Sequence, residues 1–208
     1  MSKITWKGGA LIAPLPPIMV SCRDKDSGKD NIITVAWTGI CNTIPPKTYI
    51  SVRPSRHSYN IIKNSGEFVL NLTSADLVRA ADYCGIFTGA KVDKFERCSL
   101  TKEDSTHVSC PQIAESPLSI ECRVTDIIPL GSHDMFLADI LAVNVAPELL
   151  DSDGKLCLHR AGLCAFAHGE YFELGKRLGK FGFSATKKKK NKGNGKKSSA
   201  KKTSDRKA

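Results

Sequence analysis

A short stretch of the chain gathers side chains that suit the binding of a phosphate group. Residues 53–58 bring together two guanidinium groups, two hydroxyls and an imidazole, on Arg53, Ser55, Arg56, His57 and Ser58. Arginine can grip two phosphate oxygens at once, and the start of a helix offers free backbone N–H groups. The stretch therefore predicts a phosphate anchor. The alternative is an exposed loop whose charged side chains are simply solvated.

The elements that must position this stretch are predominantly strands. Runs rich in β-branched and aromatic residues predict strands at 18–22, 32–37, 48–52, 67–72, 118–128 and 135–145, with a last strand segment within 163–174. Segment 39–46 is expected to be a loop, because Pro45 and Pro46 punctuate it.

Short helices are predicted next to these strands. One covers 58–66, closed by Gly66, and another follows the cap residue Ser74 and is closed by Gly85 at its C′ position. A short helical turn is expected from Val92. Regular strand–helix–strand alternation and a G-x-G-x-x-G loop are both missing, so a nicotinamide cofactor is not expected in a Rossmann domain. The predicted fold is mainly β, an antiparallel barrel with a few peripheral short helices.

Charge is distributed very unevenly along the 208 residues. Segment 185–208 holds eleven Lys and Arg residues and one Asp, which equals the net charge of +10 of the whole chain. The remaining 1–184 is therefore neutral overall, and any binding of nucleic acid is expected only through the tail. The tail's composition predicts disorder. We find no run long enough to span a membrane and no convincing signal peptide, and we expect a cytoplasmic protein.

Eight cysteines are scattered along the chain, and none forms a C-x-x-C pair. Zinc and iron–sulfur sites need closely spaced ligands, so we expect no metal site. Reduced thiols that act as small apolar residues are the better interpretation.

A series of motifs in fixed order resembles one known family. They are Asn31-x-x-Thr34-x-Ala36-Trp37, Pro45-Pro46, Ser51-Val52-Arg53-x-x-Arg56, 66–72 (GEFVLNL), Cys84-Gly85, Thr88-Gly89, Asp93-Lys94-Phe95, Gly131-x-His133 and 171–175 (YFELG). Over residues 12–184 the chain resembles the flavin reductase-like family that includes the flavoredoxins. The resemblance implies an FMN-binding split β-barrel over 1–184, usually a homodimer.

The resemblance also implies which residues hold the flavin. The expected cofactor-binding residues are Thr34, Ala36, Trp37, Thr38, Asn42, Ser51, Val52, Arg53, Ser55, Arg56, Asn71, Gly85, Thr88, Gly89, Lys94 and Phe95, and His133 is the expected catalytic residue near the nicotinamide donor. Each has a structural alternative. Lys94 could instead form an exposed ion pair with Asp93, and Trp37 could be a core aromatic residue. The amide of Asn71 could be satisfied by a backbone hydrogen bond, and His133 could lie in a solvated turn.

Three hypotheses follow for function. The first is an FMN-containing oxidoreductase that takes electrons from NAD(P)H and passes them to an acceptor, as flavin reductases and flavoredoxins do. The second is a flavin-binding electron-transfer protein without NAD(P)H activity. The third is a scaffold that binds acidic partners through its lysine-rich tail. The sequence distinguishes neither NADH from NADPH nor a bound FMN from a flavin substrate.

Overall fold

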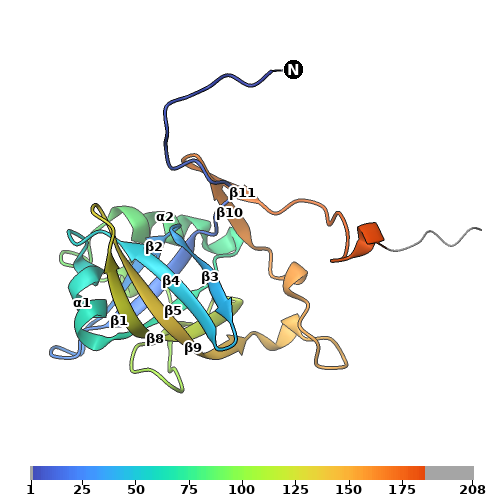
Figure 1. The fold of residues 1–208 in the computed structure, drawn as a ribbon. Coiled ribbons are helices and arrows are strands. Elements are labelled where there is room, and N and C mark those ends of the chain that lie inside the picture. Colours follow the sequence, from blue (N-terminus) through green and yellow to red (C-terminus); the bar gives the residue numbers. More distant parts are fainter. Residues whose placement is uncertain (1, 186–208) are drawn as a thin grey trace, which may run out of the picture. The chain divides into compact units, whose positions relative to one another are not determined.

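A single antiparallel sheet of seven strands organises the protein. The structure, a computed structural model, describes residues 2–185. The strand order is β2-β1-β5-β8-β9-β4-β3, and the strands are β1 (Ile18–Arg23), β2 (Asp30–Val35), β3 (Thr38–Thr43), β4 (Pro46–Val52), β5 (Glu67–Asn71), β8 (Leu118–Pro129) and β9 (Asp134–Val145). Figure 1 shows these strands curling around one another, with helices outside the sheet. The fold is mainly β, as predicted.

The two edge strands of this sheet are neighbours in the sequence. Only Ala36 and Trp37 separate the end of β2 from the start of β3, although β2 and β3 lie at opposite ends of the strand order. The sheet must therefore curl until its edges meet, as a barrel requires. The backbone N–H of Ser51 in β4 donates to the carbonyl oxygen of Trp37 at 2.9 Å. We call this junction of residues 36–37 the seam.

The strands near the start of the chain are buried on both faces. In β1, Val20 belongs to the core inside the barrel, whereas Met19 packs in a second core beneath the helices. In β2, Ile33 and Ile32 divide in the same way. Successive side chains of a strand point to opposite faces, which explains why these strands read as continuous apolar runs rather than alternating patterns.

Short helices cover the outer face. They are α1 (His57–Ser65), α2 (Val78–Ile86), which follows a 3-10 turn at Ala75–Leu77, and α3 (Lys94–Arg97). Gly66 ends α1 with φ of 70°, the left-handed conformation predicted for it. The prediction for Gly85 was wrong: α2 continues through Gly85 to Ile86 and ends at Phe87 in extended backbone.

The remaining elements are small. The pairs β6 (Lys102–Glu103) with β7 (Gln112–Ile113), and β10 (Cys164–Ala167) with β11 (Glu170–Glu173), form two-stranded sheets, and further 3-10 turns lie at Pro147–Leu149, Leu158–Arg160 and Phe183–Ala185. The chain divides into a unit ending at Leu174 and a second unit from Gly175 onward. Residues 186–208, which carry nearly all of the predicted tail, lie outside the described residues.

The six main predicted strands are confirmed within two residues at each end. The loop predicted over 39–46 was wrong, because residues 38–43 form β3 and pair with β4. The two prolines fit at the turn between β3 and β4, since Pro46 is the first residue of β4, where a proline is tolerated.

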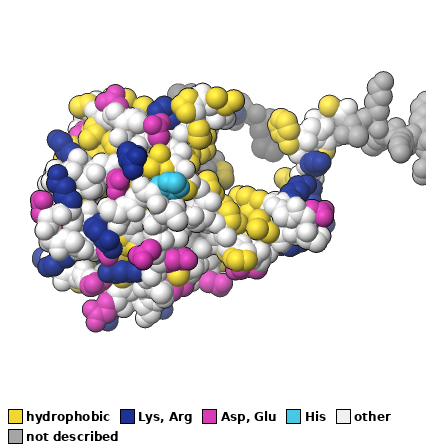
Figure 2. Space-filling view, turned by 90° about the horizontal axis from the view of Figure 1, so that it is seen from below, with side chains coloured by type: hydrophobic (Ala, Val, Ile, Leu, Met, Phe, Trp, Pro, Cys, Tyr) yellow, Lys and Arg dark blue, Asp and Glu magenta, His cyan; other side chains and the backbone are white. Residues whose placement is uncertain are grey.

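Within residues 2–185, no helix is long and apolar enough to cross a membrane. Figure 2 shows charged side chains of both signs interspersed on the face it presents, in keeping with the neutral body.

Candidate functional site

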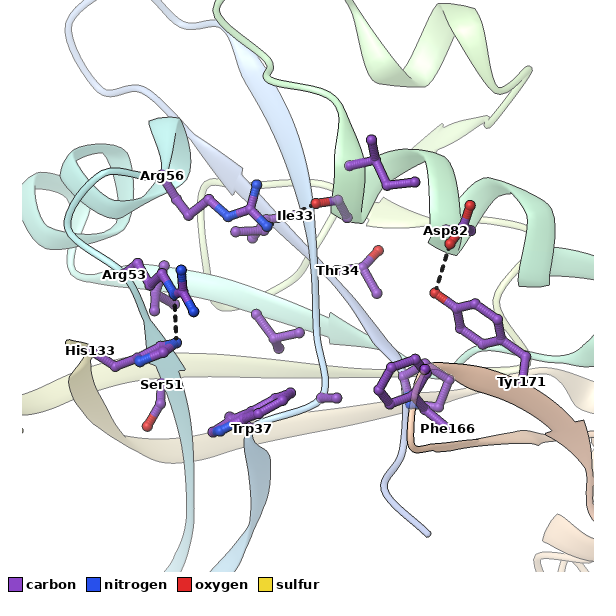
Figure 3. Close-up of a pocket in the computed structure, with 17 residues that line it drawn as sticks. Ile33, Thr34, Trp37, Ser51, Arg53, Arg56, Asp82, His133, Phe166 and Tyr171 are labelled. Atoms are coloured by element: carbon purple, nitrogen blue, oxygen red, sulfur yellow. Dashed lines mark hydrogen bonds between the residues drawn. The ribbon is translucent and has the colours of Figure 1, made fainter. Parts of the chain in front are cut away.

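The seam opens into a cavity of about 520 Å³. Residues 33–37 form one wall, and Ser51, Val52 and Arg53, from the end of β4, form another. Figure 3 shows Arg53, Arg56 and His133 gathered at one end of this cavity, with Asp82, Phe166 and Tyr171 at the other. The volume is typical of a pocket that encloses a small organic ligand. We call this space the seam cavity.

On the edge of β2 that faces away from β1, no other strand of the described residues pairs with the backbone. The carbonyl oxygen of Ile32 accepts a hydrogen bond from Lys94 and therefore points away from β1. Backbone direction alternates along a strand, so the N–H and C=O of Thr34 also point away from β1. The side chain of Thr34 donates to the carbonyl oxygen of Ala81 at 2.5 Å, which fixes β2 against α2. This edge of β2 can thus present backbone donors and acceptors to a ligand.

The basic end of the seam cavity combines charge with aromatic surface. Arg53 and Arg56 are both exposed, and neither forms an ion pair with a carboxylate in the described part of the chain. Arg56 donates to the carbonyl oxygen of Gly85 at 3.0 Å. It is also the N-cap residue of α1, whose first turn has no side-chain cap. Two guanidinium groups without a carboxylate partner in the described residues and a helix start without a side-chain cap suit an anionic group.

His133 and Trp37 lie beside these arginines. Their rings are parallel within 5°, with centroids 6.3 Å apart. Nε2 of His133 accepts a hydrogen bond from Nε of Arg53 at 3.4 Å. Burial and the charge of Arg53 lower the pKa of His133 below its ordinary value, so the imidazole is neutral at pH 7. The tip of the β8–β9 hairpin is thereby held against the seam cavity.

A second, smaller cavity of about 80 Å³ lies behind Arg56. It is lined by Ser55, Thr88, Gly89 and Lys94 among others. We call it the anchor cavity. Its size and its hydroxyl, amide and ammonium groups suit one phosphate.

Lys94 is the unusual group of the anchor cavity, because its side chain is only 3% exposed. Its Nζ donates to the carbonyl oxygens of Ile32 at 2.6 Å and Cys84 at 2.8 Å, and it forms no ion pair within residues 2–185. The alternative of an exposed pair with Asp93 fails, since Asp93 instead caps α3 by accepting from the N–H of Glu96. A buried ammonium normally has a counter-charge, and an anion in the anchor cavity would supply one.

Gly89 is held in the wall of the anchor cavity by close packing. A Cβ atom on Gly89 would lie 2.0 Å from Oδ1 of Asn31. Nδ2 of Asn31 donates to Oγ of Ser58 at 2.7 Å, so the asparagine cannot easily yield. Gly89 therefore allows the 88–89 backbone to approach both Asn31 and the anchor cavity.

Sequence comparison assigns the chain to a family. A sequence model described as the flavin reductase like domain matches residues 13–173. The chain belongs to the flavin reductase-like family. Its structure is similar to flavoredoxin of Desulfovibrio vulgaris (Miyazaki F), with a TM-score of 0.82, 32% identity, and coverage of 89% of this chain and 100% of the other. The resemblance inferred from the motifs is thus confirmed, and so is the split β-barrel fold.

The chain is also similar in sequence to two curated proteins. An uncharacterized protein of Archaeoglobus fulgidus is 33% identical over 127 residues, which cover 61% of this chain and 71% of that protein. An FMN reductase (NADH) RutF of Enterobacter cloacae is 26% identical over 55 residues, which cover 26% of this chain and 34% of that protein.

In this flavin reductase-like chain, most of the predicted site residues meet at the two cavities. Those lining the seam cavity are Thr34, Ala36, Trp37, Ser51, Val52, Arg53, Arg56, Gly85 and His133. Those lining the anchor cavity are Ser55, Arg56, Thr88, Gly89 and Lys94. The stretch 53–58 therefore contributes to both cavities, and Arg56 lies at their boundary.

Four predicted residues lie elsewhere in the structure. Thr38 is buried and donates to the carbonyl oxygen of Tyr49, and Asn42 is exposed on β3, where it donates to that of Pro45. Phe95 is buried in the core beneath the helices. Asn71 is fully buried: it donates to Met19, Ser21 and Val69, and its oxygen accepts from Ile113 and Ser119. The amide of Asn71 is thus satisfied within the protein, which was the structural alternative, and it links four segments of the chain.

Several residues of the seam cavity were not among the predicted site residues, and three of them, Asp82, Phe166 and Tyr171, form one group. Oη of Tyr171 in β11 donates to Oδ1 of Asp82 in α2 at 3.2 Å, and Phe166 of β10 packs against Tyr171 at 5.3 Å between ring centroids. Burial and Asp82 raise the pKa of Tyr171 to about 12, so the phenol stays protonated. The YFELG motif was the available signal for Tyr171, whereas Asp82 looked like an ordinary polar residue of a helix.

Proposed function

We propose that this flavin reductase-like protein binds FMN and passes electrons from NAD(P)H through it to an acceptor. The observation that carries the proposal is the buried ammonium of Lys94, which faces the anchor cavity without a carboxylate partner in the described part of the chain. A phosphate there would balance its charge. The name of the FMN reductase to which the chain is similar supports FMN as the cofactor, and the name of the flavoredoxin supports a flavin.

The residues of the two cavities fit each part of FMN. Arg56, Ser55 and Lys94 would hold the phosphate in the anchor cavity, and Arg53 would add charge at its mouth. The outward-facing backbone of β2 near Thr34 would hydrogen-bond to the edge of the isoalloxazine ring. Bound FMN supplies hydride acceptance and electron transfer, chemistry that amino-acid side chains lack.

The protein's own part is to position the donor and to exclude water. Trp37 is 45% exposed and offers an aromatic surface at the seam. His133, neutral and held by Arg53, is placed to hydrogen-bond with the nicotinamide donor without adding charge. We give His133 the role of a donor-contacting residue and assign no general acid or base, because hydride transfer between two rings requires neither.

The proposal extends to the location, the oligomeric state and the domain boundary of the protein. We propose a cytoplasmic homodimer whose barrel spans residues 1–184. The alternative of a flavin-binding protein without NAD(P)H activity shares every feature of the anchor cavity. It differs only in what happens when a nicotinamide donor is added.

The first experiment is an absorbance spectrum after the protein has been mixed with FMN and desalted. We expect flavin absorbance near one FMN per chain, which NADH or NADPH then bleaches in the absence of oxygen. Retained flavin that neither donor bleaches would leave the electron-transfer alternative. If no flavin is retained, oxidation of NAD(P)H with free FMN tests whether flavin is a substrate instead. Failure of both assays would overturn the proposal.

A further inference from the structure

A third cavity, of about 610 Å³, lies between α2 and residues 97–100. We call it the α2 cavity. It shares Asp82 with the seam cavity, so α2 forms a wall of both. None of the residues predicted from the sequence to bind the cofactor lines it, and the proposed position of FMN leaves it free.

Aromatic surface lines the α2 cavity. The rings of Tyr83 and Phe87 are one helical turn apart and stack at 4.3 Å between centroids, with planes 26° apart. Phe87 is 47% exposed even though it is large and apolar. Tyr83 is half-buried beneath it, and the exposed ring of Phe87 is a platform on which a planar base can stack, because every base offers a π face.

Two arginines lie in the same cavity. Arg79 of α2 and Arg97 of α3 are exposed, and neither forms an ion pair with a carboxylate within residues 2–185. Guanidinium groups that are free of carboxylates can grip phosphate oxygens.

The cavity also contains carboxylates, and two of them already have partners. Asp82 accepts a hydrogen bond from Tyr171, and Glu115 accepts two from the backbone N–H of Thr101. The third, Asp76, lies in the 3-10 turn before α2. Carboxylates accept hydrogen bonds from ribose hydroxyls in many dinucleotide sites. A base platform, two arginines and carboxylate acceptors together match an adenosine diphosphate.

The two cavities are close enough to hold one elongated ligand. Asp82 lies in α2 and Phe87 is the residue that caps its C-terminus, five positions later, which is about 7.5 Å along a helix axis. Ile86, which lines the seam cavity and directly precedes Phe87 in the sequence, is 63% exposed. A dinucleotide whose nicotinamide lies in the seam cavity can cross this exposed surface of α2 and reach the aromatic pair.

We infer that the α2 cavity binds the adenosine diphosphate half of the pyridine nucleotide that donates hydride in the seam cavity. This inference rests on the proposed function for the identity of the donor. The base stacks on Phe87 and Tyr83, Arg79 and Arg97 bind the diphosphate, and the carboxylates accept from ribose hydroxyls. The donor is thus held by a surface that FMN does not touch.

The test combines steady-state kinetics with ADP as a probe of the FMN-loaded protein. In the double variant Arg79→Ala/Arg97→Ala, we expect KM for the active nucleotide to rise at least fivefold, with kcat and FMN affinity unchanged. ADP should inhibit the unaltered protein competitively against the nucleotide and lose that effect in the variant. The matched control is Arg160→Ala, because Arg160 is exposed and lines none of the three cavities.

The outcomes separate this inference from the proposed function. Unchanged KM in the double variant, or ADP inhibition that is not competitive, would overturn the inference and leave FMN binding intact. If the protein oxidises neither NADH nor NADPH, calorimetric titration with ADP still decides whether the α2 cavity binds this group. Heat of binding that the double variant loses supports the site. Absence of binding at millimolar ADP refutes it.

Discussion

Nζ of Lys94 lies 2.6 Å from the carbonyl oxygen of Ile32, so a buried ammonium group donates a hydrogen bond to the edge of β2 that faces away from β1. Burial lowers the pKa of Lys94 below the ordinary value of a lysine, and the charge of Arg56 lowers it further. Because the folded protein releases this proton more readily than the unfolded chain, the contribution of Lys94 to stability rises with pH between the lowered and the ordinary pKa.

This relationship predicts a pH dependence of FMN binding. Only the protonated form of Lys94 attracts a phosphate, so FMN affinity should fall as pH rises through the lowered pKa. The Lys94→Met variant should bind FMN more weakly at pH 7 and lose most of that pH dependence. Fluorescence titration of FMN between pH 7 and 10 measures both effects. Equal pH profiles for the two proteins would remove Lys94 from the anchor.

Replacing Arg56 with alanine should weaken FMN binding. The change removes a charge-assisted hydrogen bond to the phosphate, worth about 1.5–3 kcal/mol, or about 10- to 150-fold in Kd. The same titration checks this value. Arg160→Ala should leave Kd unchanged because Arg160 is distant from the proposed anchor in sequence and lines neither of the site's cavities. An Arg56→Ala protein with unaltered affinity would show that the phosphate lies elsewhere.

Gly89→Ala tests the close packing of the anchor wall. The added Cβ would overlap with Asn31, so Asn31 or the 88–89 backbone must shift, at a cost of about 1–3 kcal/mol of folding stability. We expect a lower melting temperature together with weaker FMN binding. Gly8→Ala is the matched control, since no atom lies within 4 Å of a Cβ built there. A Gly89→Ala protein that melts and binds FMN normally would contradict the packing argument.

Glu121 predicts how the fold responds to acid. Its side chain is fully buried and accepts hydrogen bonds from Thr106, His107 and Asn144. Although burial opposes the charge, these bonds lower the pKa of Glu121 to about 2. Its stabilisation is complete above the ordinary carboxyl pKa and is lost as pH falls toward 2, about 3 kcal/mol in all.

The Glu121→Gln variant isolates this effect. Its amide N–H groups would face the N–H groups of the 106–107 backbone, so it should be less stable than the unaltered protein at pH 7. The difference should shrink as pH falls below 4. Melting temperatures across this range measure it. A constant difference at every pH would mean that the carboxylate's charge is not the stabilising factor.

A homodimer is expected from exposed apolar residues on the edge of the sheet formed by β3. On the β3–β4 hairpin, Ile40 is 64% exposed and Ile44 is 90% exposed, which is costly for a monomer in water. Light scattering should therefore give twice the 22.6 kDa mass of the chain. An Ile40→Asp/Ile44→Asp variant should shift the population toward the single-chain mass. A monomer in the unaltered protein would refute the dimer.

The sequence predicted the strands near the start of the chain well because both of their faces are buried. Val20 and Met19, or Ile33 and Ile32, make continuous apolar runs that are easy to recognise. It missed β3 because that strand lies at the sheet edge, where Ile40, Cys41 and Asn42 are exposed and alternation is weak. It placed the end of α2 two residues early, because a glycine after an apolar helical stripe resembles a helix terminator even when the helix continues.

The candidate site was predictable where its residues are adjacent in sequence. Residues 34–37 and 51–56 meet at the cavities because the seam brings the ends of β2 and β4 together. Asn71 shows the limit of such reasoning, since a buried amide in a strand signals a need for partners and does not identify them. Asp82 and Tyr171 are 89 positions apart, and only the folded chain brings them to the same cavity.

The outward edge of β2 is also a hazard. A strand edge with unpaired N–H and C=O groups can recruit a strand from another molecule and start aggregation. Lys94 occupies this edge at Ile32, and in the proposed complex the flavin would cover it at Thr34. The cofactor would then serve as a protective cover in place of a neighbouring strand. On that basis, protein stripped of FMN should associate and precipitate on warming sooner than the loaded form.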